Sequence, residues 1–157
     1  LLEKGQYAEA CKYFRLALAD NPDNETALMN MGRCFIEMQQ PDSCIPYATR
    51  LLKIYPDYDK GFNLLGVAYL TKRELTQAIS IFEHTIKVNP KFVTAYFNLG
   101  LTYARMNNIN MAERYLQKAI EVGPSFKPAY LVLADIWRQQ GRTSDAQQLL
   151  EYASTLP

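Results

Sequence analysis

The chain has 157 residues, long enough for one domain with a substantial core. It is 48% hydrophobic and 21% charged, a composition typical of soluble globular proteins rather than disordered ones. The 17 Lys and Arg residues nearly balance 16 Asp and Glu residues, so the charge favours neither nucleic acid nor an anionic membrane as a partner. The longest apolar stretch, Leu64–Leu70, is too short to span a bilayer, so we expect no membrane insertion.

The residue types that commonly build metal or catalytic sites form no recognisable motif. Cys11, Cys34 and Cys44 are an odd number of cysteines without a fourth zinc ligand, and we interpret them as small packing residues. His84 is the only histidine and is predicted to lie on the surface. We therefore predict no enzyme and no cofactor, and the absence of a disulfide framework in the sequence favours the cytoplasm.

Several residue types recur every 34 residues along the chain. Proline occurs at positions 22, 56, 90 and 124, and glycine at 32, 66 and 100, with Ala134 in the next place. One more series of small residues and two series of bulky residues keep this register. The small series is Ala10, Cys44, Ala78, Ala112 and Ala146, and the bulky series are Leu28, Phe62, Tyr96, Tyr130 and Phe35, Tyr69, Tyr103, Trp137. Five series in one register indicate a tandem repeat.

Each period contains two predicted helices. Apolar or small residues at offsets of 3, 4 and 7, which lie on one face of a helix, occur twice in each period. In one period these sets are Tyr96, Leu99, Gly100, Tyr103 and Ala112, Tyr115, Leu116, Ala119. A proline turn ends each pair, since proline cannot extend the helix before it. We call the first helix of a pair the A helix and the second the B helix.

In chain order, the pattern predicts a leading half repeat and four full repeats. Residues 1–24 are a B helix, and the full repeats cover residues 25–58, 59–92, 93–126 and 127–157. Asn24 is expected to help the first A helix begin. We interpret residues 1–157 as a single domain, and we expect a fragment of a longer protein because the chain starts inside a repeat.

The B helix of the repeat at residues 25–58 departs from the pattern. Pro46 falls near its start, so we predict either a late start near Ser43 or a bend. Large and small residues also exchange places there, with Ala48 at a bulky position and Leu51 at a small one. Such an exchange can conserve volume while it shifts the local packing.

Small residues in the middle of each pair indicate close contact between the two helices. Gly66 and Gly100 on A helices would let the B helices approach near Ala78 and Ala112. A single pair would leave half of its apolar surface in water, so stacking of neighbouring pairs is needed to complete the core. The sequence therefore predicts an all-α solenoid of antiparallel helix pairs.

This pattern resembles the tetratricopeptide repeat (TPR) family over essentially the whole chain. The resemblance rests on Tyr96-Phe97-Asn98-Leu99-Gly100 with Tyr103, Ala112, Leu116, Ala119 and Pro124. It implies a right-handed superhelix whose A helices line a concave side, where partner peptides usually bind. Asn30 and Asn98 occupy places where some TPR proteins carry an asparagine ladder that holds a peptide backbone, and Leu64 and Val132 interrupt that ladder here.

Counting along the A helices predicts the residues of the concave side. Most of them are unnecessary for the core, and they combine apolar side chains with amides that can pair with a peptide backbone. The predicted concave residues are Met29, Asn30, Arg33, Lys60, Asn63, Val67, Thr94, Phe97, Asn98, Leu101, Arg105, Leu131, Asp135 and Arg138.

The sequence favours a non-catalytic module for protein–protein interaction. We predict that it binds a peptide or extended segment of a partner protein in the concave groove, as an adaptor or assembly scaffold. A second hypothesis is a scaffold that self-assembles into a homo-oligomer by stacking repeat ends, since the first B helix and apolar residues such as Tyr152 would be left partly exposed. A third is the substrate-recruiting arm of an enzyme whose catalytic domain lies elsewhere.

Overall fold

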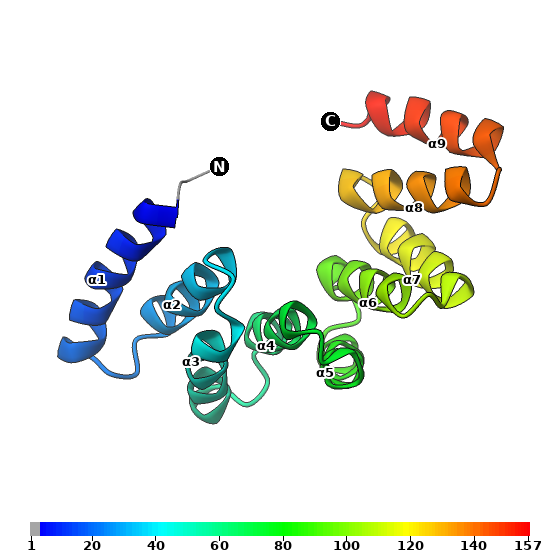
Figure 1. The fold of residues 1–157 in the computed structure, drawn as a ribbon. Coiled ribbons are helices and arrows are strands. Elements are labelled where there is room, and N and C mark those ends of the chain that lie inside the picture. The colour runs from blue at the N-terminus through cyan, green and yellow to red at the C-terminus, as the bar shows by residue number, and fades with distance from the viewer. Residues whose placement is uncertain (1–3) are drawn as a thin grey trace. The chain divides into compact units, whose positions relative to one another are not determined.

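The structure, a computed structural model, describes residues 4–157, with side chains from residue 6 onward. Residues 1–3 of the predicted half repeat lie outside the described part. Every regular element within that part is a helix, which confirms the all-α prediction. Helices α1 to α9 are Lys4–Asp20, Glu25–Glu37, Pro41–Ile54, Asp59–Lys72, Leu75–Val88, Val93–Arg105, Ile109–Val122, Lys127–Gln139 and Thr143–Thr155 (Figure 1).

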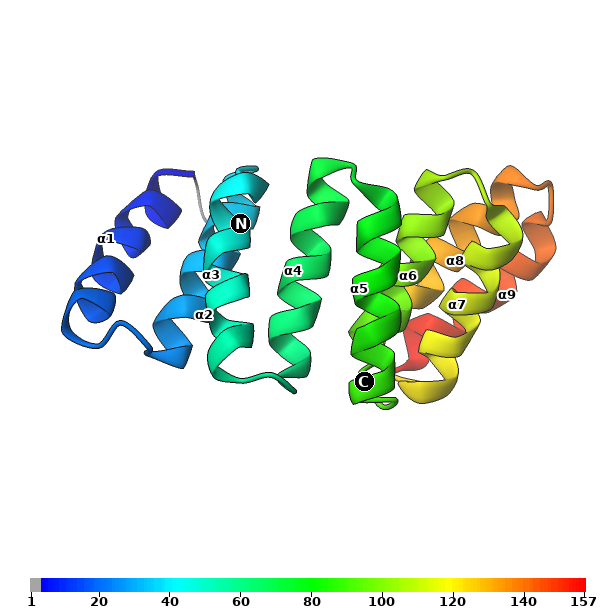
Figure 2. The same ribbon diagram turned by 90° about the horizontal axis from the view of Figure 1, so that it is seen from below.

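The helices belong to two compact units, Leu1–Val88 with α1–α5 and Asn89–Pro157 with α6–α9. In the first unit α2 pairs with α3 and α4 with α5, while α1 packs against α2 and α3 against α4. In the second unit α6 pairs with α7, α8 pairs with α9, and α7 packs against α8. Figure 2 shows α4 and α5 side by side and running in opposite directions. By their residue ranges, the even-numbered helices are A helices and the odd-numbered ones are B helices. The single-domain boundaries stay a prediction.

The turn between each A helix and its B helix contains one left-handed residue. Gln39, Arg73, Asn107 and Gly141 have φ values of 59°, 66°, 58° and 80°, and they lie 34 residues apart. A non-glycine residue in this conformation costs roughly 1 kcal/mol or more. The same backbone reversal therefore recurs in every repeat, although only the last repeat has glycine there.

Two helices begin at asparagine caps. Asn24 Oδ1 accepts a hydrogen bond from the Ala27 N–H at 2.9 Å, which confirms the role predicted for Asn24. Asn108 Oδ1 accepts one from the Met111 N–H at 3.3 Å at the start of α7. Each cap satisfies an N–H group that has no partner within its helix.

Of the two alternatives predicted for α3, the late start near Ser43 is wrong, and the bend at Pro46 stays a prediction. The helix begins at Pro41, where proline is well tolerated because first-turn N–H groups have no intrahelical partner. Pro46 therefore lies inside the helix rather than at its first turn, and it removes one backbone hydrogen bond there. The packing of the face that carries Cys44, Ala48 and Leu51, all fully buried, keeps this segment helical.

Two glycines of the A helices, Gly66 and Gly100, lie in close contact with the paired B helices. A Cβ atom on Gly66 would lie 2.5 Å from Cε1 of Phe82, and one on Gly100 would lie 2.9 Å from Cγ of Leu116. Phe82 and Leu116 are fully buried, so neither has room to withdraw. Glycine at these positions is therefore a requirement of packing.

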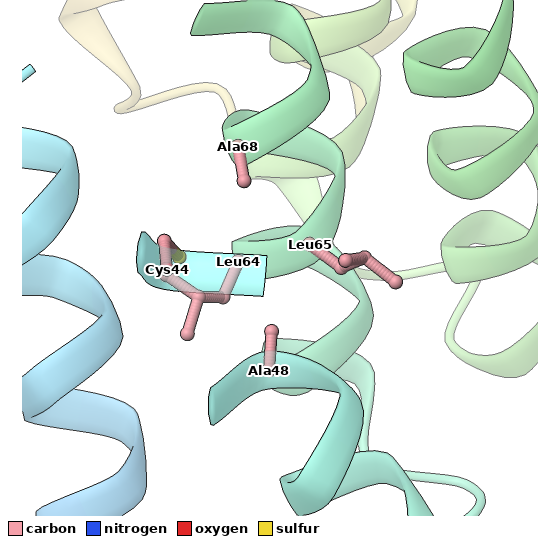
Figure 3. Close-up of a cluster of buried hydrophobic side chains, with 5 residues drawn as sticks. All are labelled: Cys44, Ala48, Leu64, Leu65 and Ala68. Atoms are coloured by element: carbon pink, nitrogen blue, oxygen red, sulfur yellow. The ribbon is translucent and has the colours of Figure 1, made fainter. Parts of the chain in front are cut away.

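A cluster of buried apolar residues joins α3 to α4. Figure 3 shows Leu64 beside Cys44, with Ala48 and Ala68 close by and Leu65 directed to the other side of α4. All five residues are at most 8% exposed. Ala48 stands at a position that is bulky in other repeats, and the larger Leu64 of the neighbouring A helix packs in the same cluster. The exchange of large and small residues is thus accommodated between repeats.

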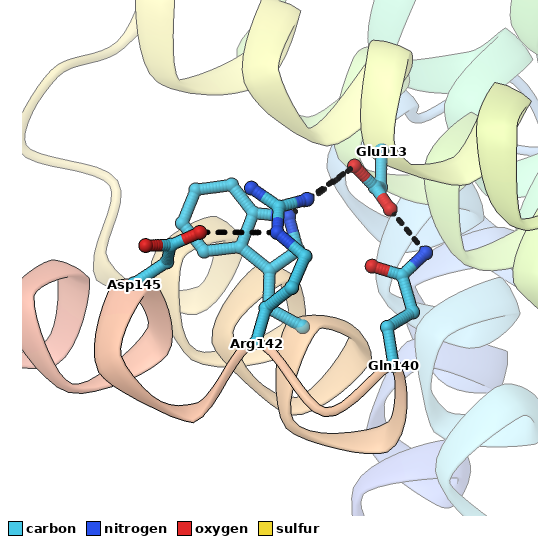
Figure 4. A network of polar contacts seen from close by, with 5 residues as sticks. Glu113, Gln140, Arg142 and Asp145 are labelled. Atoms are coloured by element: carbon cyan, nitrogen blue, oxygen red, sulfur yellow. Dashed lines mark hydrogen bonds and ion pairs between the residues drawn. The ribbon is translucent and has the colours of Figure 1, made fainter.

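A polar network joins α7 to the last helix pair (Figure 4). Glu113 of α7 accepts hydrogen bonds from Nε1–H of Trp137 at 3.2 Å and from the side-chain amide of Gln140 at 2.6 Å. Arg142 lies 3.4 Å from the same carboxylate, bonds Asp145 at 3.1 Å and places its guanidinium 4.3 Å from the centre of the Trp137 ring. Only 18% of the Glu113 side chain is exposed, so this carboxylate is a well-enclosed acceptor.

Glu113→Ala is expected to lower the free energy of unfolding by about 1–2 kcal/mol, because Trp137, Gln140 and Arg142 lose a partly buried acceptor. Urea denaturation followed by fluorescence measures this loss, and Trp137 is the only tryptophan, so the signal reports on the network. The matched control is Glu121→Ala, which removes an exposed pair with Lys118 on the same helix and should cost less than about 0.5 kcal/mol. Equal losses in the two variants would contradict the role of the network.

Gly66→Ala is expected to destabilise the protein by about 1 kcal/mol. Alanine gains about 1 kcal/mol of helix propensity, but the new methyl group overlaps the Phe82 ring, and overpacking typically costs about 1–3 kcal/mol. In a Phe82→Leu background, which removes the overlapping ring atoms, the same substitution should become neutral or stabilising. A double-mutant cycle by thermal denaturation measures the coupling, and additive effects would show that the close contact is unimportant.

Candidate functional site

The predicted concave residues of the first unit lie on α2 and α4, which pack directly against each other. Helix α2 carries Met29, Asn30 and Arg33, and α4 carries Lys60, Asn63 and Val67. Arg33 and Lys60 are exposed, and the other four are partly buried. Met29 packs against the cluster around Cys44, so part of its side chain serves the core.

A hollow of about 320 Å³ lies between α1 and α2, and we call it the α1–α2 hollow. Its α1 wall is formed by Tyr7, Ala10 and Phe14, and its α2 wall by Asn30, Arg33, Cys34 and Glu37. An apolar wall thus faces a wall that offers an amide, a cation and a carboxylate. This combination suits a polypeptide ligand with one apolar side.

Sequence reasoning found only the α2 wall of this hollow. Asn30 and Arg33 were predicted concave residues, whereas Tyr7, Ala10 and Phe14 were assigned to a B helix and its core face. The signal that could have found them is the spacing of Tyr7, Ala10 and Phe14 by three and four residues, which places them on one face of a helix.

The thiol of Cys34 in the α1–α2 hollow is protonated at neutral pH. Burial raises the pKa of Cys34 to about 11, and the neighbouring Cys11 adds to this shift. Burial alone raises the pKa of Cys44 to about 12. Because the thiolate is the reactive form, these thiols are poor nucleophiles, and all three cysteines are buried without a disulfide.

The predicted concave residues of the second unit lie on α6 and α8. Helix α6 carries Thr94, Phe97, Asn98, Leu101 and Arg105, and α8 carries Leu131, Asp135 and Arg138. The rings of Phe97 and Phe126 pack edge to face, with their centroids 5.3 Å apart. Part of the Phe97 side chain therefore contacts the protein itself. Leu131 is 55% exposed, and Asp135 accepts a hydrogen bond from the Gln139 side chain at 2.9 Å.

Asn98 is more enclosed than the other predicted amides. It is 7% exposed, and its backbone carbonyl accepts the Thr102 hydroxyl at 2.7 Å. Asn30 and Asn63 are partly exposed. The amides of Asn30 and Asn63 are therefore more accessible to a ligand than the amide of Asn98.

Two hollows of the second unit contain none of the predicted concave residues. One of about 380 Å³ is lined by Tyr96, Arg114, Tyr115, Gln117, Lys118 and Glu121. The other, of about 350 Å³, is lined by Trp137, Asp145, Gln148, Leu149 and Tyr152. Lys118 is already bonded to Glu121 at 2.7 Å, which raises the pKa of its ammonium group. In the first hollow, the positive charge of Lys118 is therefore already paired with the carboxylate of Glu121.

The described residues give no sign of metal chemistry. Between residues 4 and 157, no group of three or more His, Cys, Asp or Glu side chains could hold a metal ion. His84 is exposed, and its ring meets Phe62 edge-on at 4.4 Å. No helix in the same range has both the length and the apolar character needed to cross a membrane.

Three tetratricopeptide repeat family models match the chain, at residues 1–67, 63–109 and 93–126. Together the matches run without a gap over residues 1–126. A search of curated proteins finds no match.

Several solved structures share the fold. TTC0263, a thermophilic TPR protein of Thermus thermophilus, has a TM-score of 0.84 and 25% identity over 95% of this chain and 82% of that chain. A crystal structure of MamA has a TM-score of 0.75 and 23% identity over 96% of this chain and 88% of that chain. PilF of Pseudomonas aeruginosa has a TM-score of 0.80 and 18% identity, covering 97% of this chain and 69% of that chain.

The 34-residue period, the helix pairs and the family matches agree with one another. TPR proteins are all-α solenoids and are generally non-catalytic modules with protein partners, and the protein-interaction function predicted from the sequence agrees with this. The chain belongs to the tetratricopeptide repeat family.

Proposed function

We propose that the chain is a non-catalytic adaptor or assembly scaffold that binds a segment of a partner protein along its A helices. The observation that carries this proposal is the α1–α2 hollow, where an apolar wall faces an amide and two opposite charges. Apolar walls supply most of the binding energy in such sites, and a few polar groups orient the ligand. This hollow joins both kinds of group on two helices of one unit.

The exposed charges on α2 and α4 extend the binding surface. Arg33 and Lys60 place two cations on neighbouring A helices, against one carboxylate, Glu37. Asn30 and Asn63 add amides that can both donate to and accept from a peptide backbone. The balance of charge favours a partner segment with acidic residues beside its apolar ones.

The double variant Arg33→Glu/Lys60→Glu is expected to weaken partner binding by about tenfold or more, because it reverses both cations. The chain serves as bait for affinity capture, and the captured partner is then purified and titrated by calorimetry. The melting temperature should be nearly unchanged, since exposed substitutions usually alter stability by less than about 0.5 kcal/mol.

The matched control is Lys53→Glu/Lys87→Glu, which makes the same charge change at exposed positions on the B helices α3 and α5. It should leave the affinity for the partner unchanged. An equal loss of affinity in both double variants would indicate a general effect of net charge and would rule out binding along α2 and α4.

A further inference from the structure

Two of the three cysteines lie in one buried cluster between α1 and α2. The cluster consists of Cys11 of α1 with Met31 and Cys34 of α2, which are 5%, 0% and 7% exposed. The thiol of Cys34 donates a hydrogen bond to the sulfur of Cys11, so the two sulfur atoms are in direct contact. Cys44 lies elsewhere, in the cluster that joins α3 to α4.

The contact between Cys11 and Cys34 belongs to the way in which one repeat stacks on the next. Ile45 of α3 and Ala68 of α4 occupy the same two places 34 residues later. Ile45 and Ala68 also pack in one cluster, between α3 and α4. The B helix of one repeat therefore meets the A helix of the next at these two positions in both interfaces.

Packing does not require sulfur at either of these positions. An isoleucine beside an alanine fills the corresponding place between α3 and α4, and Ala68 there is fully buried. Two thiols in contact add a chemistry that an isoleucine and an alanine cannot supply, the formation of a disulfide.

The cluster can accommodate a disulfide with little rearrangement. The bond places its two sulfur atoms about 2 Å apart. Thiols that share a hydrogen bond can reach this separation by a small rotation about their Cα–Cβ bonds and a slight approach of the two helices. A disulfide has no hydrogen-bond donor, so it leaves no buried donor unsatisfied among the apolar neighbours of the pair.

We propose that Cys11 and Cys34 form a redox modification site, at which a low-molecular-weight disulfide such as oxidised glutathione converts the two thiols into a bond that links α1 covalently to α2. The inference goes beyond the proposed function, because it requires no partner protein.

The exchange balances in atoms and electrons. An S–S bond forms between Sγ of Cys11 and Sγ of Cys34, and the S–S bond of the small disulfide breaks. The two protein thiols are oxidised and lose their protons. The two sulfur atoms of the small disulfide are reduced and take up these protons as two thiols. The intermediate is a mixed disulfide on one cysteine, from which the second cysteine displaces the small thiol.

Burial makes this modification slow and durable. The thiolate is the attacking form, and the pKa of Cys34, raised to about 11, leaves little thiolate at neutral pH. Once formed, the bond is enclosed by the same residues that enclose the thiols, so a reductant reaches it only when α1 separates from α2. The site therefore suits a lasting response to an oxidising compartment rather than a rapid signal.

The bond changes how firmly α1 is held. In the reduced chain, α1 is attached by its packing against α2 and by the turn between the two helices. The disulfide closes a loop over residues 11–34, and such a closure stabilises a protein mainly by constraining its unfolded chain. Oxidation therefore fixes α1 to the first full repeat.

The test incubates the folded chain with oxidised glutathione and counts the free thiols after denaturation. The count is expected to fall from three to one per chain. The intact mass should fall by the mass of two hydrogen atoms, with no glutathione attached, and the product should remain monomeric on a non-reducing gel. Its melting temperature should rise by about 5 °C or more relative to the reduced chain.

Two variants make the same change at buried positions where other repeats carry alanine. Cys34→Ala matches Ala68, and Cys44→Ala matches Ala78 and Ala112, so both variants should fold. The oxidised Cys44→Ala chain should have no free thiol and should show the same rise in melting temperature. The Cys34→Ala chain should form no internal disulfide, and oxidation should leave its melting temperature unchanged.

The incubation is repeated at a urea concentration that leaves the chain folded by circular dichroism, so that slow access does not hide the reaction. Three free thiols under both conditions, glutathione retained on the product, or a disulfide-linked dimer would each overturn the inference. An internal disulfide in Cys34→Ala, which would pair Cys11 with Cys44, would also overturn it. The same holds for an oxidised chain that melts at the temperature of the reduced one.

Discussion

The fold depends on how closely each A helix approaches its B helix. At Gly66 and Gly100 the two backbones come so near that a single added carbon would overlap a buried side chain of the partner helix. A core packed to this density has no room for a larger side chain at the glycine, so the small residue and its large neighbour must occur together. In the repeats at residues 59–92 and 93–126, a glycine paired with Phe82 or Leu116 thus sets how closely the two helices pack.

The recurrence of this contact explains both the core and the candidate site. Gly66 of α4 lies against Phe82 of α5, and Phe82 is fully buried. Phe14 holds the corresponding position in α1 and lines the α1–α2 hollow. The same face of a B helix therefore lies in the core at α5 and borders the candidate site at α1.

Much of this architecture could be predicted from the sequence, because the signals repeat. The 34-residue series located the helix pairs, and Asn24 marked a helix start correctly. The start of α3 was misplaced because Pro46 was taken as a first-turn residue, whereas Pro41 occupies that turn. The left-handed turn residues Gln39 and Arg73 carry no glycine signature, so only the structure identifies them.

Burial of individual polar residues was harder to predict than the fold. Counting residues along an A helix predicts which face of the helix a side chain lies on. It does not predict how much of that face the neighbouring helices cover. Asn98 therefore emerged almost fully enclosed, whereas Asn30 lies in an accessible hollow. Tyr13 and Leu16 follow the repeat pattern in the sequence, and no single residue reveals that their side chains are exposed in the structure.

The position of α1 also has a consequence for the dynamics of the chain. In a solenoid, stability is approximately a sum of repeat contributions and nearest-neighbour interfaces. Helix α1 has one main interface, with α2, while α3 lies between α2 and α4. Opening of α1 therefore breaks the fewest contacts of any helix in the first unit, and its amide protons should exchange with solvent earliest.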